Sequence, residues 1–153
     1  MSTYTATVRW SHEGDGDFTK GQYSRAHVWA FDGGAVVPAS ASPHIVPAPW
    51  SDPAGVDPEE AFIAAIASCH MLFFLDYARR DGWTIDSYVD EALGVMEKDA
   101  NGKIAVTKVT LRPKIAWGGD KQPSSEEIAH LHHCAHEDCF IANSMKTEVV
   151  VKA

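Results

Sequence analysis

A long apolar helix is the feature that most constrains the fold of this chain. Residues 61–75, AFIAAIASCHMLFFL, contain only two polar side chains. A helix-start signal stands directly before them: Asp57 can act as the N-cap, Pro58 suits the first helical position, and Glu60 completes a capping box. The sequence therefore predicts a helix that begins at this point.

The other end of the helix and its surroundings follow from its composition. Arg79 and Arg80 complement the dipole at a helix C-terminus, and Gly82 allows the chain to turn, so we expect the helix to end there. Because the segment is apolar on nearly every face, it should be the buried central helix of the domain. The apolar run is shorter than the roughly 20 residues of a membrane span, and we expect no membrane association.

The residues before the helix indicate strands and a long loop. Segments 2–11 and 22–31 alternate polar or small residues with apolar ones and are predicted as strands, followed by a turn at 32–34. Six prolines between 38 and 58 exclude a helix or a central strand there. A loop this long within a compact domain is usually functional.

The residues after the helix indicate a hairpin, a second helix and a last strand. Segments 84–97 and 103–117 are predicted as two long paired strands joined by the turn KDANGK. Ser124 and Glu127 form a second capping box that opens a helix. Segment 146–153, KTEVVVKA, is predicted as the last strand.

This order of elements predicts the fold class. It lacks a regular alternation of strands and helices and a glycine-rich phosphate loop, so we expect an α+β fold, with antiparallel sheets around the central helix. A chain of 153 residues, 45% of them hydrophobic, can form a single domain with its own core, and we expect residues 1–153 to do so.

The charge of the chain and its N-terminal residues limit the binding partners and the cellular compartment that we expect. The net charge is −8 and no run of Lys or Arg occurs, so nucleic acid is an unsuitable partner. The segment MSTYTATVRW has neither the basic start nor the apolar core of a signal peptide. We therefore expect a cytosolic protein whose cysteines are initially reduced.

The three cysteines are the residues most capable of chemistry. Cys69 lies within the apolar helix, where it is either a core residue or a nucleophile activated by a nearby cation or hydrogen-bond donor. Cys139 follows the second helix, and Asp138 could cap a short turn whose N-terminus stabilises a thiolate there. The 70 residues between Cys69 and Cys139 leave open whether the two thiols meet.

The histidines offer two further interpretations. His132 and His136 are spaced as a helical metal-binding pair, with Cys134 or Cys139 as a further ligand, but a solvated helix face that also carries residues 130 and 133 explains them better. No metal is predicted. His70 adjoins Cys69, yet neighbours on a helix point about 100° apart, so a Cys–His pair is not expected.

Three features of the sequence resemble the OsmC/Ohr family of peroxidases. Segment 57–65, DPEEAFIAA, running into Ala-Ser-Cys at 67–69, resembles the family helix that carries the reactive cysteine. Segment 135–139, AHEDC, ahead of Asn-Ser at 143–144, resembles the segment with the resolving cysteine. The order of elements matches over nearly the whole chain.

This resemblance implies both a structure and a reaction. The structure would be an interlocked homodimer with two central helices and the active site at the subunit boundary. The reaction would be reduction of organic hydroperoxides: Cys69 attacks and becomes a sulfenic acid, Cys139 condenses with it to a disulfide, and a cellular dithiol reduces that disulfide. The resemblance implies no cofactor.

The resemblance also assigns supporting residues. A family glutamate corresponds to Glu59, which holds an arginine that stabilises the thiolate; because Glu59 and Cys69 are separated by a rise of about 15 Å, a long side chain or a second subunit must connect them. The proline-rich loop has no arginine, so Arg25 is the predicted cation, and His44 is a possible thiolate-stabilising or pocket residue. Cys134 has no counterpart in the family pattern.

Two other classes of function remain open at this level. The alternative to a peroxidase is a binding protein without peroxide turnover, in which Cys69 acts as a thiol sensor or holds a small molecule. A metal-dependent protein that uses residues 130–139 is the third class. The sequence names neither the peroxide nor the reductant.

Overall fold

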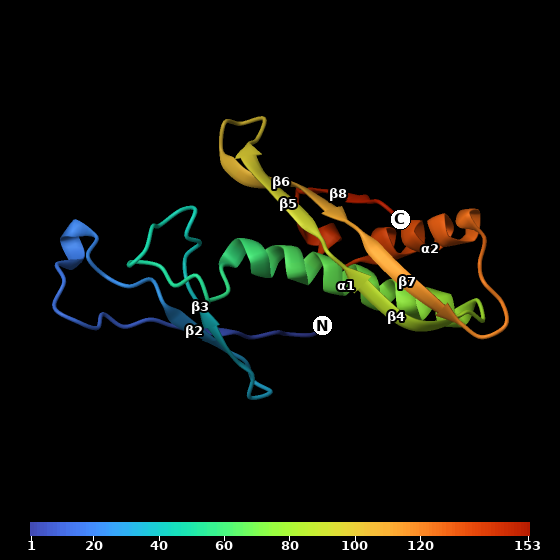
Figure 1. Cartoon of the computed structure of the whole chain (residues 1–153), viewed down its shortest axis with the longest axis horizontal. Coiled ribbons are helices and arrows are strands. Elements are labelled where there is room, and N and C mark those ends of the chain that lie inside the picture. Colours follow the sequence, from blue (N-terminus) through green and yellow to red (C-terminus); the bar gives the residue numbers. More distant parts are fainter. The chain divides into compact units, whose positions relative to one another are not determined.

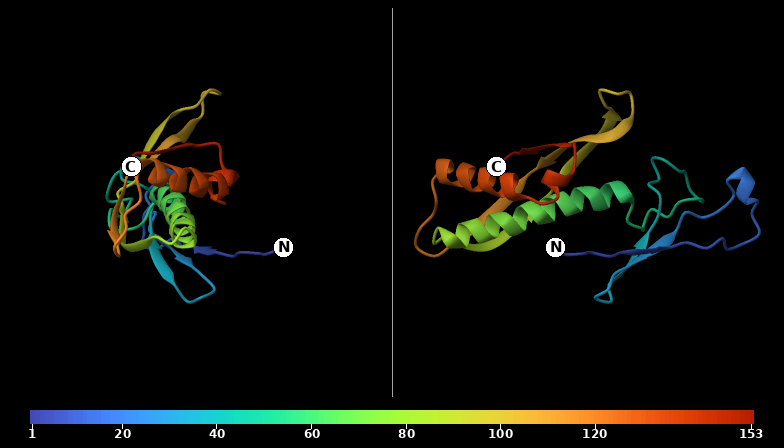
Figure 2. Two further views of the ribbon diagram at one scale, coloured as in Figure 1. Left: turned by 90° about the vertical axis from the view of Figure 1, so that its right-hand side faces the viewer. Right: turned by 180° about the vertical axis from the view of Figure 1, so that it is seen from behind.

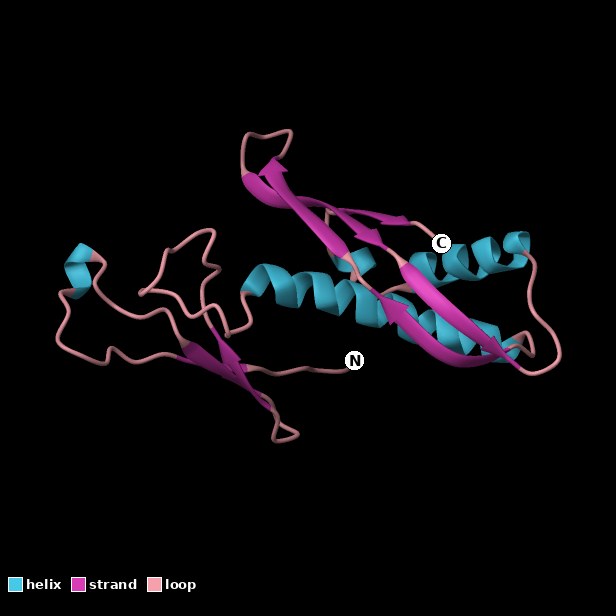
Figure 3. Cartoon of the chain, viewed as in Figure 1, coloured by secondary structure: helices cyan, strands magenta, loops and turns pink.

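The computed structural model describes all residues, 1–153, and divides into two compact units, Met1–Ala61 and Phe62–Ala153 (Figure 1). Helices and strands occur together, and the strands form three small sheets (Figure 3). The predicted mixture of helix and sheet is therefore confirmed. The expectation of one domain over 1–153 stays a prediction.

The first unit carries a three-stranded antiparallel sheet. Strands β1 (Thr7–Arg9), β2 (His27–Ala30) and β3 (Val36–Ala39) pair in the order β1-β2-β3, and a 3₁₀ turn, η1 (Phe18–Lys20), lies between the first two. The two predicted strands exist but are shorter than the alternating patterns. Strand β3 was not predicted because it contains Pro38, which is tolerated here because β3 is an edge strand.

The proline-rich loop is attached to β3. Val56 forms a bridge with Ala39, its N–H donates to the Pro38 carbonyl at 2.9 Å, and its own carbonyl accepts from the Ser40 N–H at 3.1 Å. The Ser40 hydroxyl also accepts from the Asp52 N–H at 2.9 Å. The loop therefore returns to the sheet immediately before the long helix begins.

Helix α1 (Pro58–Arg80) begins and ends as predicted. The Asp57 carboxylate accepts from the Glu60 N–H at 2.8 Å, and the Glu60 carboxylate accepts from the Asp57 N–H at 3.1 Å, so the capping box is present. After Arg80 the chain turns through Gly82, whose φ of 84° suits glycine.

The expected full burial of α1 was wrong for the single chain. Only one stripe is buried, consisting of Ile66, His70, Phe74 and Ala78, and Leu72 on another face is 59% exposed. By length and composition alone the 23-residue helix could cross a membrane. Core helices of soluble proteins can have the same length and composition. The apolar run of 15 residues is shorter than a membrane span, but the whole helix has 23 residues.

The predicted hairpin is present but bent into two parts. Its outer part pairs β5 (Leu93–Lys98) with β6 (Ile104–Leu111), and its inner part pairs β4 (Thr84–Asp90) with β7 (Pro113–Gly118). At the bend the Arg112 N–H donates to the Asp90 carboxylate at 2.7 Å, and the Arg112 side chain donates to the Glu91 carbonyl at 2.6 Å. One hairpin therefore contributes to two sheets.

Helix α2 (Ser125–Asp138) begins at the predicted capping box of Ser124 and Glu127 and lies alongside α1 (Figures 1 and 2). A 3₁₀ turn, η2 (Ala142–Ser144), follows, and then β8 (Glu148–Val151). Strand β8 pairs with β6 in parallel, whereas the other strand pairs are antiparallel as expected. A parallel pair needs a long crossover, and the segment that contains α2 supplies it.

Two apolar clusters hold the second unit together. The first joins α1 and α2 to β4 and β7 around Phe74, Ala78, Leu131 and Ala135. The second joins α1 to β6 and β8 around Ile66, Val109 and Leu111. Because Cys69 lies between Ile66 and Phe74 on α1, the reactive segment stands between the two clusters.

Candidate thiol site

Cys69 and Cys139 are brought together by the second unit. Cys69 is half-buried in the middle of α1, and Cys139 is buried with 1% exposure at the residue that caps α2. The two thiol groups are near enough for Cys69 to affect the ionisation of Cys139, both as a hydrogen-bond partner and as a charge. Neither cysteine is in a disulfide. Their individual roles stay predictions.

The environment of Cys139 favours its protonated form. Burial raises the pKa of Cys139, and its contact with Cys69 raises it further, whereas the backbone N–H groups of Ala142 and Ile141 act in the opposite direction. The Ala142 N–H lies 3.4 Å from the Cys139 sulfur. Cys139 therefore favours its protonated form, with Cys69 as a hydrogen-bond partner of that form.

The predicted cap by Asp138 is not formed. Asp138 is the last residue of α2, and its carboxylate accepts a hydrogen bond from the Tyr77 hydroxyl on α1. The turn after Cys139 is closed by main-chain groups instead: the Asn143 N–H donates to the Cys139 carbonyl at 3.0 Å. The donors near the thiol are thus backbone N–H groups of this turn.

Arg25 lies in an apolar pocket of the first unit. The pocket has a volume of about 440 Å³, and Trp10, Phe18 and Tyr23 are among the residues that line it with Arg25. The guanidinium stands 3.6 Å above the centre of the Tyr23 ring and donates to the carbonyls of Gly21 and Tyr23 at 2.8 and 2.6 Å. Arg25 is therefore held in one orientation by stacking and hydrogen bonds.

The other two predicted supporting residues also belong to the first unit. Glu59 is half-buried in the first turn of α1, and none of the ion pairs within the chain involves it. The implied contact between Glu59 and Arg25 is therefore not made within this chain. His44 is exposed in a turn of the proline-rich loop, where its backbone N–H donates to the Ser42 hydroxyl.

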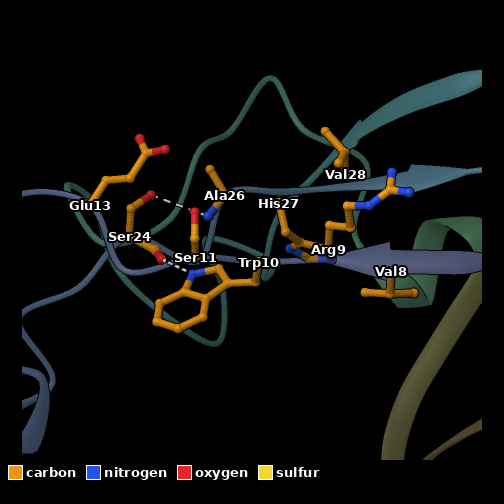
Figure 4. Close-up of a pocket in the computed structure, with 9 residues that line it drawn as sticks. All are labelled: Val8, Arg9, Trp10, Ser11, Glu13, Ser24, Ala26, His27 and Val28. Carbon is orange, nitrogen blue, oxygen red and sulfur yellow. Dashed lines mark hydrogen bonds between the residues drawn. The ribbon is translucent and has the colours of Figure 1, made fainter.

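A larger and more polar pocket also belongs to the first unit. It has a volume of about 690 Å³ and lies between residues 8–13 and 24–28 (Figure 4). The Trp10 indole N–H donates to the Ser24 carbonyl at 2.7 Å, and the Ser24 hydroxyl accepts from the Ala26 N–H at 3.1 Å. The lining of this pocket includes charged and polar side chains but no cysteine.

The histidines of α2 do not all form the predicted solvated face. His132 is buried with 4% exposure, and its Nδ1 lies 2.9 Å from Nε2 of His70, which is also buried. Burial lowers the pKa of both histidines to about 4, so both are neutral at pH 7. Only the residues at 130 and 133 are exposed as expected, and His136 is intermediate.

A metal centre is not apparent among these residues. No group of three or more His, Cys, Asp or Glu side chains is arranged to hold a metal ion. Cys134 is intermediate in exposure, and its sulfur lies 3.5 Å from Nε2 of His130, one helical turn earlier. It is the third thiol of the chain, and the family pattern does not explain it.

The fold and the thiol pair define a mixed helix-and-sheet protein with a helix-borne cysteine beside a second cysteine. The model of the OsmC-like protein family matches residues 51–153, and the chain belongs to this family. No protein with curated annotation matches the chain.

Solved structures extend the likeness over the whole chain. An OsmC-like protein of unknown function from Vibrio cholerae is 51% identical, with a TM-score of 0.97 over 99% of both chains. The organic hydroperoxide resistance protein OhrB of Bacillus subtilis is 24% identical, with a TM-score of 0.67 over 99% of this chain and 96% of its own. An organic hydroperoxide resistance protein from Elizabethkingia anophelis is 17% identical, with a TM-score of 0.70 over 99% and 94%. The last two show a shared fold, and the family supports a redox or stress-response role.

Proposed function

We propose that this protein is a thiol-dependent peroxidase that reduces organic hydroperoxides in the cytosol, with Cys69 as the attacking and Cys139 as the resolving cysteine. The observation that carries this proposal is the meeting of two reduced thiols that are 70 residues apart in the sequence. Family membership and the fold shared with hydroperoxide resistance proteins support it.

The assignment of roles rests on the proton of Cys139. In the first step the Cys69 thiolate forms an S–O bond with the distal peroxide oxygen, the O–O bond breaks, and the alkoxide takes up a proton to leave as an alcohol. In the second step the Cys139 sulfur displaces hydroxide from the Cys69 sulfenic acid, and the Cys139 proton converts that hydroxide to water. A dithiol then reduces the disulfide, so no organic cofactor is required.

The negative charge of the Cys69 thiolate also gives a reason why attack on the peroxide precedes disulfide formation. While Cys69 is negatively charged, its charge helps to keep Cys139 protonated. Conversion of Cys69 to a neutral sulfenic acid removes that charge, and the pKa of Cys139 then falls toward its ordinary value. Cys139 therefore becomes a better nucleophile at the moment when resolution is needed.

Arg25 remains the proposed cation for the Cys69 thiolate, with Glu59 and His44 as further members of the site. The support for Arg25 is its fixed orientation in an apolar pocket, where a cation has a stronger electrostatic effect than in water. The apolar lining also suits the organic part of a bulky hydroperoxide. Arg25→Gln should therefore slow Cys69 oxidation.

The uncovered apolar surface supports the proposed homodimer. Ala39 is the only fully buried hydrophobic residue of the first unit, whereas large apolar side chains such as Val8, Trp10 and Phe18 are exposed. On α1 an exposed stripe contains Ala64, Ala65, Ser68 and Leu72. A second copy of the chain would cover such surfaces, and small residues would allow two α1 helices to approach closely.

The test is consumption of an organic hydroperoxide by the reduced protein with an excess of dithiol. We expect turnover by the wild type, none by Cys69→Ser, and an unresolved sulfenic acid or dependence on the added thiol in Cys139→Ser. Cys134→Ser is the matched control, since it removes a thiol from α2 without removing either proposed reactant. Full activity of Cys69→Ser would contradict the proposal.

An inert wild type whose Cys69 is rapidly alkylated would favour the alternative of a thiol sensor or small-molecule-binding protein. One observation favours this alternative. The Arg25 guanidinium already donates hydrogen bonds to two carbonyls of its own loop, which leaves fewer of its donors for a thiolate.

A further inference from the structure

The turn that carries Cys139 is attached to α1 on both sides of the thiol. Immediately before the thiol, the Asp138 carboxylate accepts a hydrogen bond from the Tyr77 hydroxyl. Immediately after it, the Phe140 ring meets the Phe73 ring edge to face, with 4.9 Å between the ring centres and 81° between their planes. Cys139 therefore stands between two contacts with the helix that bears Cys69.

The α1 residues in these contacts share a face with Cys69. Residues four apart on a helix are neighbours, so Cys69, Phe73 and Tyr77 follow one another along one side of α1. Their partners are the three consecutive residues 138–140. Any movement of Cys139 away from Cys69 would therefore have to break the Tyr77 hydrogen bond or the aromatic contact.

The turn itself is closed by its own hydrogen bonds. The Cys139 N–H donates to the His136 carbonyl at 3.3 Å, the Asn143 N–H donates to the Cys139 carbonyl, and the Asn143 side chain donates to the Glu137 carbonyl at 3.1 Å. Ser144 donates its hydroxyl proton to the Phe140 carbonyl at 2.7 Å. A turn closed in this way moves as one piece, so two attachments are enough to orient the thiol.

The polar attachment persists over the physiological pH range. The hydrogen bond to Asp138 raises the pKa of Tyr77, so its hydroxyl keeps its proton and remains a donor. A hydrogen bond from a neutral donor to a carboxylate is stronger than one between two neutral groups. The ring contact does not depend on pH.

We propose that Tyr77 and Phe73 are positioning residues that hold the Cys139 turn against α1 and thereby set how readily Cys139 forms a disulfide with Cys69. The proposal deepens the peroxidase function given above and rests on it for its place in the reaction. Neither residue touches the peroxide in this scheme; they act only through Cys139. Disulfide formation becomes more favourable because the two reacting thiols are kept close together and oriented.

The first experiment needs no peroxide. Equilibration with oxidised and reduced glutathione, in which the two protein thiols form a disulfide as one oxidised glutathione becomes two reduced ones, measures the effective concentration of the Cys69–Cys139 pair. We expect Tyr77→Phe and Phe73→Leu each to lower it several-fold, on the order of tenfold together. Tyr4→Phe removes the same hydroxyl from a residue that is 92% exposed and should change nothing.

A second pair of variants separates positioning from general stability. Asp138→Asn keeps an oxygen that can accept from Tyr77, although without the carboxylate charge, and should lose less than Asp138→Ala. Asp138→Ala lacks the acceptor and should behave like Tyr77→Phe. Circular dichroism at the assay temperature confirms that each variant is folded, and an equal loss in both Asp138 variants would contradict the positioning role.

The second experiment follows the peroxide reaction. After an excess of an organic hydroperoxide, which supplies the second equivalent that over-oxidation consumes, mass spectrometry of quenched samples measures Cys69 sulfenic acid, the disulfide with Cys139 and the over-oxidised sulfinic acid. In the double variant Tyr77→Phe/Phe73→Leu the sulfenic acid should form at the wild-type rate, the disulfide roughly tenfold more slowly, and more sulfinic acid should accumulate.

The two experiments have separable outcomes. An unchanged effective concentration in both α1 variants overturns the positioning role, whether or not the protein consumes peroxide. A lowered effective concentration in the variants, together with no sulfenic acid in the wild type, overturns the peroxidase function and leaves the positioning of Cys139 in place.

Discussion

His70 and His132 are two neutral imidazoles buried between α1 and α2. Their rings are stacked with 5.2 Å between centres, and the only hydrogen bond either ring makes within the chain is the one that joins them. No carboxylate is among the groups that shift the pKa of His70 or His132. Burial lowers both pKa values, and His132 and His136 lower that of His70 further. A proton on either ring would therefore be costly in the folded state.

This pair predicts a loss of stability in mild acid. The folded-state pKa of about 4 lies below the ordinary value of 6.5, so the unfolded chain binds protons first, and stability falls as the pH drops from 6.5 toward 4. At pH 5 the loss should be on the order of 2 kcal/mol for each histidine. Urea unfolding of the wild type at pH 7 and pH 5 measures it.

His132→Gln should reduce this loss by about half, because one of the two buried titrating groups is gone. The exposed neighbour His133→Gln should keep the full loss, since this change leaves both buried histidines in place. A pH dependence that is the same in both variants would show that other groups cause it.

At the scale of elements, the attachment of the proline-rich loop to β3 depends on Gly55. A Cβ atom at this position would lie 2.9 Å from the Ala39 carbonyl carbon and 3.0 Å from the Ser40 nitrogen, both of which belong to the main chain. Gly55→Ala should therefore destabilise the protein by roughly 1–3 kcal/mol. Gly33→Ala, where a Cβ meets open space, is the control, and equal denaturation midpoints of the two variants would contradict the expectation.

The elements that sequence reasoning predicted best are those with local chemical signals. Asp57 and Ser124 were identified as caps because capping uses residues only three positions apart. The bend of the hairpin at Arg112 was not predicted, because the hydrogen bonds that stabilise it come from Asp90 and Glu91, about twenty residues earlier. The parallel pairing of β8 with β6 is non-local in the same way.

The residues of the candidate site show the same difference between local and non-local signals. Cys69 and Cys139 could be selected from the sequence, but their contact could not, because it depends on the packing of α2 against α1. The burial of His132 was missed because an apolar environment is an exception for histidine on an otherwise polar helix. Phe73 and Tyr77 follow Cys69 at helical spacing, which is a signal visible in the sequence.

At the scale of the whole molecule, the exposed side of α1 predicts a contact between copies of the chain. Leu72→Glu places a charge on a residue that is 59% exposed in the single chain and should be buried in the proposed dimer. We expect this variant to be monomeric in analytical ultracentrifugation at concentrations where the wild type is dimeric. Lys121→Glu, an exposed change outside the helices and strands, should leave the dimer intact.

The parallel pairing of β8 with β6 also determines when the fold can be completed during synthesis. Strand β6 is synthesised before β8, so Val109 and Leu111 acquire their neighbours Val149 and Val151 only after the whole of α2 and the Cys139 turn have been made. Because Ile66 of α1 packs in that same cluster, part of the helix that carries Cys69 must wait as well. The cluster that holds this part of α1 can therefore be completed only after both Cys69 and Cys139 have been synthesised.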